Sequence, residues 1–512
     1  MTSAARGGLL VGAGILASRL VGLVRQRVVA HYLGTGDAAD ALAAAFRVGN
    51  ITQNLLGEGA LSASFIPVYA RLREAEGQPR ATAFARAALG ALAPVALAVS
   101  ALGVLAAPAL AALVGSGFTG DKLRLAASLI RVLFPMTGAL VVGAWALGVL
   151  NTHKRLFLPY AAPVVWSVAQ IVAVVLAASR EGATPAALAT AVAWGALGGA
   201  LLQVAVMLAP VRGLLGAVAP RLDLADPGVR EAASKLPASL MGRGVMQLSA
   251  LVDTAMVGTL GAGAVASVTY AQTIYLLPMA LLGTGEAAAS LPELARRGVA
   301  LDDERRQEIR ASLGAQLGRV VPLAAGAATA FLATGAEITT LLLRGGRFDQ
   351  ASTREVTHVL MAYALALPPN AASRVLSTAC YALGDTAGPA RFASVRVAVS
   401  TLTSLALLRP FGAPGVVFGS VVGAWVELAL LAGAVRAKVG GAGGAQLPYL
   451  PLWAACAVCA SFAAIARYFA VRWDVNVYLA AVAVLAFAGT GFAGACEALG
   501  VVKVRALLRR RG

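Results

Sequence analysis

The chain has 512 residues, of which 59% are hydrophobic and only 13% are charged, and its mean hydropathy is +0.78. Soluble globular proteins carry about 25% charged residues, so this composition excludes a cytosolic enzyme, a disordered chain and a disulfide-rich scaffold, and it predicts an all-α polytopic membrane protein. The 42 Lys and Arg against 24 Asp and Glu give a net charge of +18, which in so apolar a chain indicates basic cytoplasmic loops and basic residues inside the membrane rather than nucleic-acid binding.

Apolar runs long enough to cross a membrane follow one another along the whole chain. A membrane-spanning helix needs about 20 predominantly apolar residues. This criterion predicts about fourteen transmembrane helices, at residues 7–33, 41–70, 83–115, 123–150, 159–179, 185–210, 236–260, 264–291, 319–343, 355–383, 389–408, 413–435, 449–470 and 477–500. The longest polar insertion, residues 292–318, is predicted to form an interfacial helix.

The basic residues between these helices favour one orientation. An even number of helices places both termini on the same side of the membrane. The segments on that side include Arg71, Arg73, Arg80, Lys154, Arg155, Arg296, Arg297, Arg305, Arg306, Arg310, Lys503, Arg505, Arg509, Arg510 and Arg511. Because basic loops face the cytoplasm, both termini are predicted to be cytoplasmic.

The sequence lacks the motifs of nucleotide-driven or hydrolytic chemistry. It has no GxxxxGK[ST] phosphate-binding loop and no Ser/His/Asp or Cys/His constellation, which favours a transporter over an enzyme. The four cysteines, Cys380, Cys456, Cys459 and Cys496, all lie in apolar runs. They are predicted to pack between helices, since no second CxxC or neighbouring histidine completes a metal or redox motif.

A short turn recurs in the two halves of the chain. Residues 33–40 read LGTGDAAD and residues 260–267 read LGAGAVAS, each between consecutive predicted helices. Chance similarity in an Ala/Gly-rich chain is the alternative explanation. The recurrence predicts an N-terminal lobe at 1–212, a C-terminal lobe at 213–440, and two extra helices with a basic cytoplasmic tail at 441–512. Substrate sites in transporters built from repeats lie near the midplane between the halves.

Nine arginines fall within the predicted membrane spans. They are Arg19, Arg25, Arg27, Arg47, Arg131, Arg243, Arg374, Arg396 and Arg467. A central arginine costs about 2.5–3.5 kcal/mol on insertion scales, so these side chains do not all face lipid. Two interpretations are open. Each arginine pairs with an internal carboxylate, or the arginines line a wet cationic cavity whose guanidinium groups hold the phosphates of an anionic head group.

The sequence around the first two predicted helices resembles the MurJ (MviN) lipid II flippase family of the MOP transporter superfamily. The matching features are Ser18-Arg19, Gly22, Arg25, an LGxGxxxDA turn, Asn50, Glu58-Gly59-Ala60 and FIPVY at 65–69, with LLLRGGRFD at 341–349 and Ala382-Leu383-Gly384-Asp385-Thr386 with Pro389 further along. The resemblance implies two six-helix lobes around a central cavity, with the last two helices forming a lipid-facing groove.

The resemblance also implies a function and a location. The family moves lipid II, a peptidoglycan precursor linked to undecaprenyl pyrophosphate, from the inner to the outer leaflet of the bacterial inner membrane by alternating access without ATP. The implied partners are this lipid-linked anionic glycan, membrane lipids and cell-wall synthesis proteins.

Site residues carry over from the matching motifs. Arg19 and Arg25 are expected to bind the pyrophosphate. Ser18, Arg47, Asn50 and Glu58 are expected to bind the substrate or brace the cavity around it. Asp40 and Gly34 are expected at the outer gate.

Sodium is the one ion that the resemblance implies. Asp253, Ser404 and Ser420, together with Ser400 and Val416, match a sodium site of some family members. Carboxylate, hydroxyl and carbonyl oxygens suit a hard cation. The alternative is that Asp253 pairs with an intramembrane arginine, such as Arg243, Arg374 or Arg396. No other cofactor is expected.

Three departures from the family pattern leave further functions open. Gln26 stands where the family has Asp, residues 52–54 lack an arginine, and Tyr270-Ala271-Gln272 lacks the charges of the eighth helix. These differences keep two alternatives: a flippase for another polyprenyl-linked glycan, or a non-transporting membrane scaffold. A multidrug exporter is less favoured because cationic drugs need carboxylates where this chain has arginines.

Overall fold

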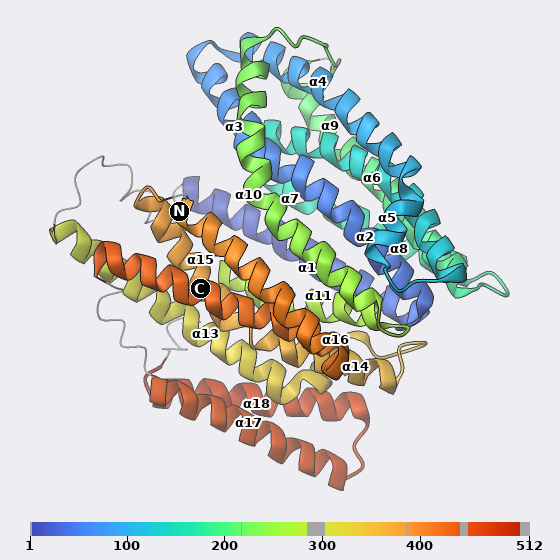
Figure 1. Ribbon diagram of the computed structural model, residues 1–512, viewed down its shortest axis with the longest axis vertical. Coiled ribbons are helices and arrows are strands. Elements are labelled where there is room, and N and C mark those ends of the chain that lie inside the picture. The colour runs from blue at the N-terminus through green and yellow to red at the C-terminus, as the bar shows by residue number, and fades with distance from the viewer. Residues whose placement is uncertain (1–2, 217, 284–302, 386, 441–448, 502–512) are drawn as a thin grey trace. The chain divides into compact units, whose positions relative to one another are not determined.

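The computed structural model describes residues 3–216, 218–283, 303–385, 387–440 and 449–501. Within these ranges the regular structure is α-helical, apart from one isolated bridge between Gly345 and Phe348. The chain forms two compact units (Figure 1), Met1–Ala266 with Gly345–Phe348, and Ser267–Arg344 with Asp349–Gly512. The prediction of an all-α polytopic fold is confirmed. The lobe boundaries at residues 212 and 440 stay a prediction, since a division by contacts does not test a division by sequence repeat.

The first unit follows the predicted helices closely. Its helices are α1 (Ser3–Leu33), α2 (Asp37–Leu56), α3 (Glu58–Ala75), α4 (Gln78–Leu105), α5 (Ala107–Val114), α6 (Gly120–Thr152), α7 (Phe157–Ala161), α8 (Pro163–Ala178), α9 (Pro185–Leu215) and α10 (Pro227–Gly258), and it includes the start of α11 (Ala264–Gly283). Predicted helix 41–70 is interrupted at Gly57, where a Cβ atom would lie 2.5 Å from the carbonyl oxygen of Gln53. Only glycine fits this break without displacing backbone.

The second unit contains the remaining helices. They are α13 (Asp303–Leu343), α14 (Gln350–Ala364), α15 (Leu367–Ala382), α16 (Ala387–Val439), α17 (Tyr449–Arg472) and α18 (Val477–Ala498). Helix α16 covers two predicted spans, which meet at a kink where Gly412 has φ 60° and ψ −140°. Residues 303–318 form the first part of α13, so this part of the predicted interfacial segment is continuous with the span predicted at 319–343 and is not a separate helix. Residues 292–302 lie outside the described residues.

Membrane-spanning character is clear in eight of the described helices. Their length and hydropathy suffice to cross a bilayer: Gln78–Leu105, Gly120–Thr152, Phe157–Ala178, Pro185–Leu215, Arg306–Leu343, Ala387–Val439, Leu450–Arg472 and Val477–Ala498. Helix α16 is long enough for two crossings at about 1.5 Å per residue. The count of fourteen spans stays a prediction.

Aromatic rings lock the core of the first unit. Phe65 of α3 stacks on Phe84 of α4, with ring centroids 5.3 Å apart, and on Tyr69, at 5.4 Å. Trp145 of α6 is fully buried and donates its indole N–H to the carbonyl oxygen of Ala85 at 3.0 Å. Such ring pairs contribute about 0.5–1.5 kcal/mol beyond the area they bury, so α3, α4 and α6 pack as one block.

Small residues bring α8 and α9 close together. A Cβ atom on Gly195 would lie 2.7 Å from the Cβ of Ala173, and one on Gly199 would lie 2.9 Å from the Cβ of Ala169. This is the small-residue spacing that lets membrane helices approach. It fixes the position of α8, which carries Trp166.

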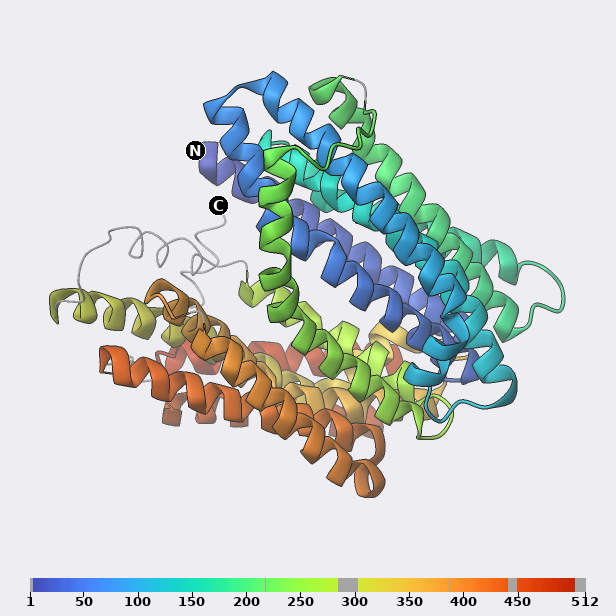
Figure 2. The same cartoon turned by 45° about the horizontal axis from the view of Figure 1, so that its top comes forward.

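An ion pair and a helix cap join α10 to the helix hairpin of α3 and α4. Helices α3 and α10 lie side by side in both views (Figure 2). Asp226 caps the first turn of α10 by accepting the N–H groups of Gly228 at 2.8 Å and Val229 at 3.2 Å, and it pairs with Arg80 of α4 at 2.8 and 3.2 Å. Burial raises the pKa of the Asp226 carboxyl, but these hydrogen bonds more than offset burial, so the pKa lies below its ordinary value.

The terminal helices α17 and α18 form an antiparallel hairpin (Figure 1). Small and sulfur-containing side chains fill the contact between them, among them Cys459, Ala463, Val484 and Ala488. The four cysteines are buried and free. Cys459 therefore packs between helices, as its apolar surroundings predict.

The cap on α10 gives a stability prediction. Replacing Asp226 with Ala removes the helix cap and leaves Arg80 with only its longer contact to Glu76, at 3.7 Å. The substitution should lower the free energy of unfolding by about 1–2 kcal/mol and Tm by about 1 °C for each kcal/mol in a chain of this length. Because the folded-state pKa is lowered, the stabilisation is present above about pH 4 and disappears as the pH falls through the folded pKa. Thermal unfolding of the purified protein at pH 7 and at pH 3 measures both effects.

Asp223→Ala is the matched control, since Asp223 lies only three residues away and contacts the exposed Arg221 at 3.5 Å. Exposed pairs contribute little, so its Tm should stay near that of the wild type. Equal losses in the two variants would contradict the role assigned to Asp226.

Candidate functional site

Arg25 is held by an amide and an aromatic ring rather than by an acid. Its guanidinium lies over the ring of Trp166, 4.9 Å from the centroid, and one terminal nitrogen donates to Oε1 of Gln170 at 3.0 Å. Its Nε is buried and makes no hydrogen bond within the described structure. No acid therefore pairs with Arg25 in the described structure, and several of its N–H donors are unused, which are the features that a phosphate ligand needs.

Helix α8 positions both partners of Arg25. Gln170 is fully buried and donates to the carbonyl oxygen of Trp166 at 3.1 Å, one turn earlier on the same face. The ring of Phe46 on α2 meets the edge of Trp166 with centroids 6.2 Å apart. Helices α1, α2 and α8 therefore converge on this tryptophan. We call Arg25, Trp166, Gln170 and Phe46 the arginine cradle.

The other predicted substrate residues lie along α1 and α2. Arg19 and Asn50 are exposed, and Arg47, next to Phe46 of the cradle, is half-buried. The hydroxyl of Ser18 donates to the carbonyl oxygen of Ile15 at 2.9 Å. Glu58 is the first residue of α3, and its side chain lies outside what the structure describes. The structure thus places Arg47 and Arg25 on helices that meet at the cradle, and their contact with substrate stays a prediction.

Two of the intramembrane arginines are neutralised by acids. Arg396 pairs with Glu427 at 2.6 Å within α16, and Arg467 of α17 pairs with Glu337 of α13 at 2.7 Å. For these two the carboxylate-pairing interpretation holds. Arg25 differs from both because its neighbours in the described structure are neutral.

Asp40, predicted at the outer gate, is completely buried and receives three hydrogen bonds. Lys122 contacts one carboxylate oxygen at 2.6 Å, and the N–H groups of Gly263 and Ala266 donate to the carboxylate at 2.7 and 2.8 Å. These two N–H groups belong to the first turn of α11 and its preceding turn, so Asp40 caps α11 from a distant part of the sequence. Lys122 also contacts the more exposed Asp37 at 2.9 Å.

The recurring turns lie against each other around this carboxylate. Gly34 has φ 60° and Gly263 has φ 92°, and a Cβ atom on Gly263 would overlap the carbonyl oxygen of Thr35. The backbone N–H of Arg347 donates to the carbonyl oxygen of His31 at 2.8 Å, which closes the same turn from the 345–348 segment. Glycine is needed at both turns, because a side chain would be strained by the backbone and would clash with the facing chain.

The residues predicted to bind sodium occur in two groups, one on α16 and one on α10. On α16, Ser404 donates to the carbonyl oxygen of Val416 at 2.8 Å, and Ser400 and Ser420 share a hydrogen bond at 3.2 Å. Asp253 is half-buried on α10. The serine and carbonyl oxygens are hard donors that suit Na⁺. Within the described residues no cluster of three or more His, Cys, Asp or Glu side chains could hold a metal.

Sequence reasoning missed Trp166, Gln170 and Lys122. A signal for the first two was present, since a glutamine inside the apolar run 159–179 follows a tryptophan at helical spacing. Lys122 lies in the short segment between the predicted helices 83–115 and 123–150, and its pairing with Asp40 depends on the tertiary fold.

Sequence comparisons give a consistent family. A family model described as "Lipid II flippase MurJ" matches residues 29–484. "Probable lipid II flippase MurJ" of Rhizobium meliloti (strain 1021) is 32% identical over 472 residues, covering 90% of this chain and 86% of the relative. "Lipid II flippase MurJ" of Burkholderia cenocepacia is 30% identical over 429 residues, covering 83% and 82%.

The fold comparisons agree. A structure titled "Lipid II flippase MurJ, inward closed conformation" superposes with a TM-score of 0.77 at 18% identity, covering 96% of this chain and 98% of that one. An inward-facing MATE family transporter of the MOP superfamily superposes with a TM-score of 0.68 at 17% identity, covering 85% and 98%. With the match to the family model over most of its length and relatives at 30% identity or more, the chain belongs to the lipid II flippase MurJ family.

Proposed function

We propose that this multi-pass membrane protein is a transporter that flips lipid II from the inner to the outer leaflet of a bacterial inner membrane by alternating access, without hydrolysing ATP. Arg25 carries this proposal, because it is an intramembrane guanidinium held by neutral groups and left with unused donors. Burying a charge inside a membrane-embedded helical bundle costs free energy, so a buried arginine that no acid neutralises marks a functional site. The family membership of the chain supplies the substrate.

The cradle suits a pyrophosphate better than a single carboxylate. Stacking on Trp166 fixes the plane of the Arg25 guanidinium, and Gln170 occupies one of its five N–H donors. The remaining donors can form forked contacts with phosphate oxygens. Arg19 lies six residues earlier on α1, about 120° around an ideal helix, and Arg47 lies on α2 beside the cradle. We infer that Arg19, Arg25 and Arg47 together neutralise the negative charge of the pyrophosphate. Ser18, Asn50 and Glu58 then surround it.

We assign the outer gate to Asp40, Lys122 and the two glycine turns. A buried ion pair gains little net stability, because its Coulomb attraction is offset by the cost of removing both charges from water. Opening the gate would return both charges to water, so the pair can close the site and still separate during transport. The Asp40–Lys122 pair therefore selects one closed arrangement of the helices. Separating the pair to open the gate costs little free energy.

We place both termini in the cytoplasm. The basic segments assigned to that side support this orientation, since positive loops are retained on the inner face. The expected partners are the lipid-linked glycan, membrane lipids and proteins of cell-wall synthesis. A flippase for another polyprenyl-linked glycan remains the alternative that the missing charges of the second half favour.

The arginine cradle predicts the effect of single substitutions on binding and transport. Arg25→Ala and Gln170→Leu should weaken binding of lipid II to the purified protein about tenfold or more, because each removes or misplaces a charge-assisted contact. Both variants should fail to rescue a bacterial strain depleted of its own lipid II flippase while reaching normal protein levels. Arg131→Ala is the control, because Arg131 is an exposed arginine of α6 outside the cradle. Full rescue by Arg25→Ala would overturn the proposal.

The gate predicts a measurable coupling between Asp40 and Lys122. Lys122→Met leaves a buried carboxylate without its cation and should lower stability by about 3–5 kcal/mol. Asp40→Asn combined with Lys122→Met should recover part of that loss, because no uncompensated charge remains. A double-mutant cycle on unfolding of the purified protein gives the coupling energy. Asp37→Asn, at the exposed partner, should change stability little. Strict additivity of the two substitutions would contradict the gate assignment.

Sodium coupling is a separate proposal that rests on Asp253, Ser404 and Ser420. If these residues hold Na⁺, sodium chloride should raise Tm by about 3 °C or more over potassium chloride at equal ionic strength, through mass action on the folded state. Asp253→Asn should abolish the difference, and Ser404→Ala should reduce it. A sodium-specific shift that persists in Asp253→Asn would exclude this carboxylate as a ligand.

A further inference from the structure

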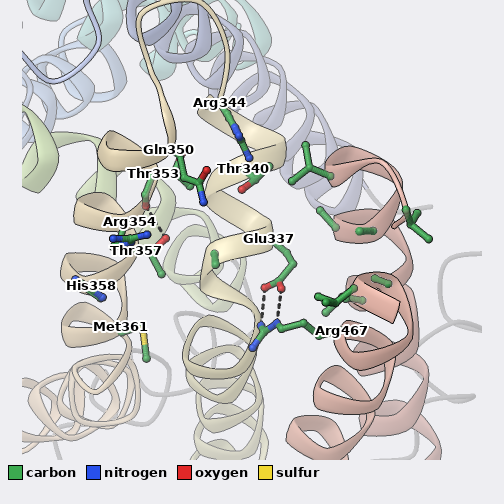
Figure 3. Close-up of a pocket in the computed structure, with 18 of the residues that line it drawn as sticks. Glu337, Thr340, Arg344, Gln350, Thr353, Arg354, Thr357, His358, Met361 and Arg467 are labelled. Carbon is green, nitrogen blue, oxygen red and sulfur yellow. Dashed lines mark hydrogen bonds and ion pairs between the residues drawn. The ribbon is translucent and has the colours of Figure 1, made fainter. Parts of the chain in front are cut away.

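A cavity of about 550 Å³ lies within the second unit, between α13, α14 and the α17–α18 hairpin (Figure 3). None of the residues assigned to substrate, gate or sodium lines it. Its lining combines arginines, hydroxyl groups and an apolar wall.

An ion pair crosses the cavity and is already satisfied. Arg467 of α17 donates from Nε to Glu337 at 2.7 Å and from a terminal nitrogen to the same carboxylate at 2.9 Å, as the dashed lines in Figure 3 show. It also donates to the carbonyl oxygen of Ala333 at 2.8 Å. This forked pair fastens the hairpin to α13 and has no net charge, so it does not need a ligand.

Two further arginines line the cavity without such partners. The side chains of Arg344, at the end of α13, and Arg354, on α14, make no hydrogen bond or ion pair with the described part of the chain. Asp474 is the one other acid of the lining. Three arginines against two carboxylates leave an excess of one positive charge. The hydroxyl of Thr340 and the amide of Gln350 add hydrogen-bonding groups beside Arg344 (Figure 3). The polar part of the cavity therefore favours an anion.

The opposite wall is apolar and belongs to the hairpin. Val471, Val475, Val477 and Val484 line this side. Two aromatic residues mark the same end of the hairpin, Trp473, which is 69% exposed, and Tyr478, which is 38% exposed and donates to the carbonyl oxygen of Arg344 at 3.3 Å.

Tryptophan and tyrosine concentrate where a membrane meets water. The positive part of the cavity therefore lies at the level of lipid head groups. Valines that line the cavity and exposed apolar side chains such as Leu479 and Val482 continue into the hydrocarbon region.

We propose that this cavity binds an anionic phospholipid, with its phosphate between Arg344 and Arg354 and one acyl chain along the valines of the hairpin. A free anion would not use the apolar wall, and an uncharged lipid would not use the arginines. The proposal goes beyond flipping, because it assigns a resident lipid to the terminal hairpin and does not depend on the transported substrate.

The test is native mass spectrometry of the full-length protein in detergent, titrated with phosphatidylglycerol and with diacylglycerol of the same chains. Phosphatidylglycerol should bind at least about tenfold more tightly than diacylglycerol, as expected for charge-assisted phosphate contacts. The double variant Arg344→Gln/Arg354→Gln should lose about tenfold in phosphatidylglycerol affinity. Arg472→Gln, which removes an exposed arginine at the same end of the hairpin but outside the lining, should bind as the wild type does.

A second variant tests the cavity without changing its charge. Ala336 is exposed and lines the cavity, so Ala336→Trp should fill it and also weaken phosphatidylglycerol binding about tenfold. Inorganic phosphate is the competitor that identifies a simple anion site. The proposal is overturned if phosphate alone displaces the lipid at equal concentration, if diacylglycerol binds equally well, or if both cavity variants keep wild-type affinity. Lipid II binding is measured on the cavity variants as well and should stay at the wild-type value, so failure here is distinguishable from failure of the flippase proposal.

Discussion

An ionised side chain inside a membrane-embedded bundle costs several kcal/mol unless another group neutralises it or accepts its hydrogen bonds. In this protein that requirement determines where helices meet. Asp40 brings together α2, Lys122 of α6 and the first turn of α11, while Glu337 and Arg467 fasten the terminal hairpin to α13. Each of these contacts joins helices that are distant in sequence.

Arg25 satisfies the same requirement in a different way. An aromatic face and a neutral amide stabilise its charge without cancelling it. An acid in the place of Gln170 would bind the guanidinium more strongly but would repel a phosphate. The cradle thus keeps a cation that is stable inside the bundle and still attractive to an anion. The Asp40–Lys122 pair and the cradle meet the requirement in opposite ways: the pair neutralises its own charges, whereas the cradle leaves a cation that can attract an anion.

Hydropathy predicted the helices well because burial in a bilayer demands long apolar runs. Predicted span 123–150 corresponds to α6 at Gly120–Thr152, and span 185–210 to α9 at Pro185–Leu215. The break at Gly57 could not be predicted, since a chain with 56 glycines gives no reason to choose one.

The candidate site could be predicted in part. The family motifs indicated Arg25 and Asp40. Their partners could not be inferred, because Gln170 is 145 residues from Arg25 and Lys122 is 82 residues from Asp40. Contacts over such separations follow from packing, as in the close approach of α8 and α9 at Gly195 and Gly199.

The terminal hairpin packs mainly on α13, and the match to the family model ends at residue 484, within α18. A two-helix appendage that rests on one neighbouring helix is under fewer steric constraints than helices packed on every side. Related proteins should therefore accumulate substitutions and length changes in this hairpin faster than in the rest of the chain. A mismatch between helix length and bilayer thickness can accordingly be relieved at the hairpin by tilting or lengthening its two helices, with few neighbouring helices displaced.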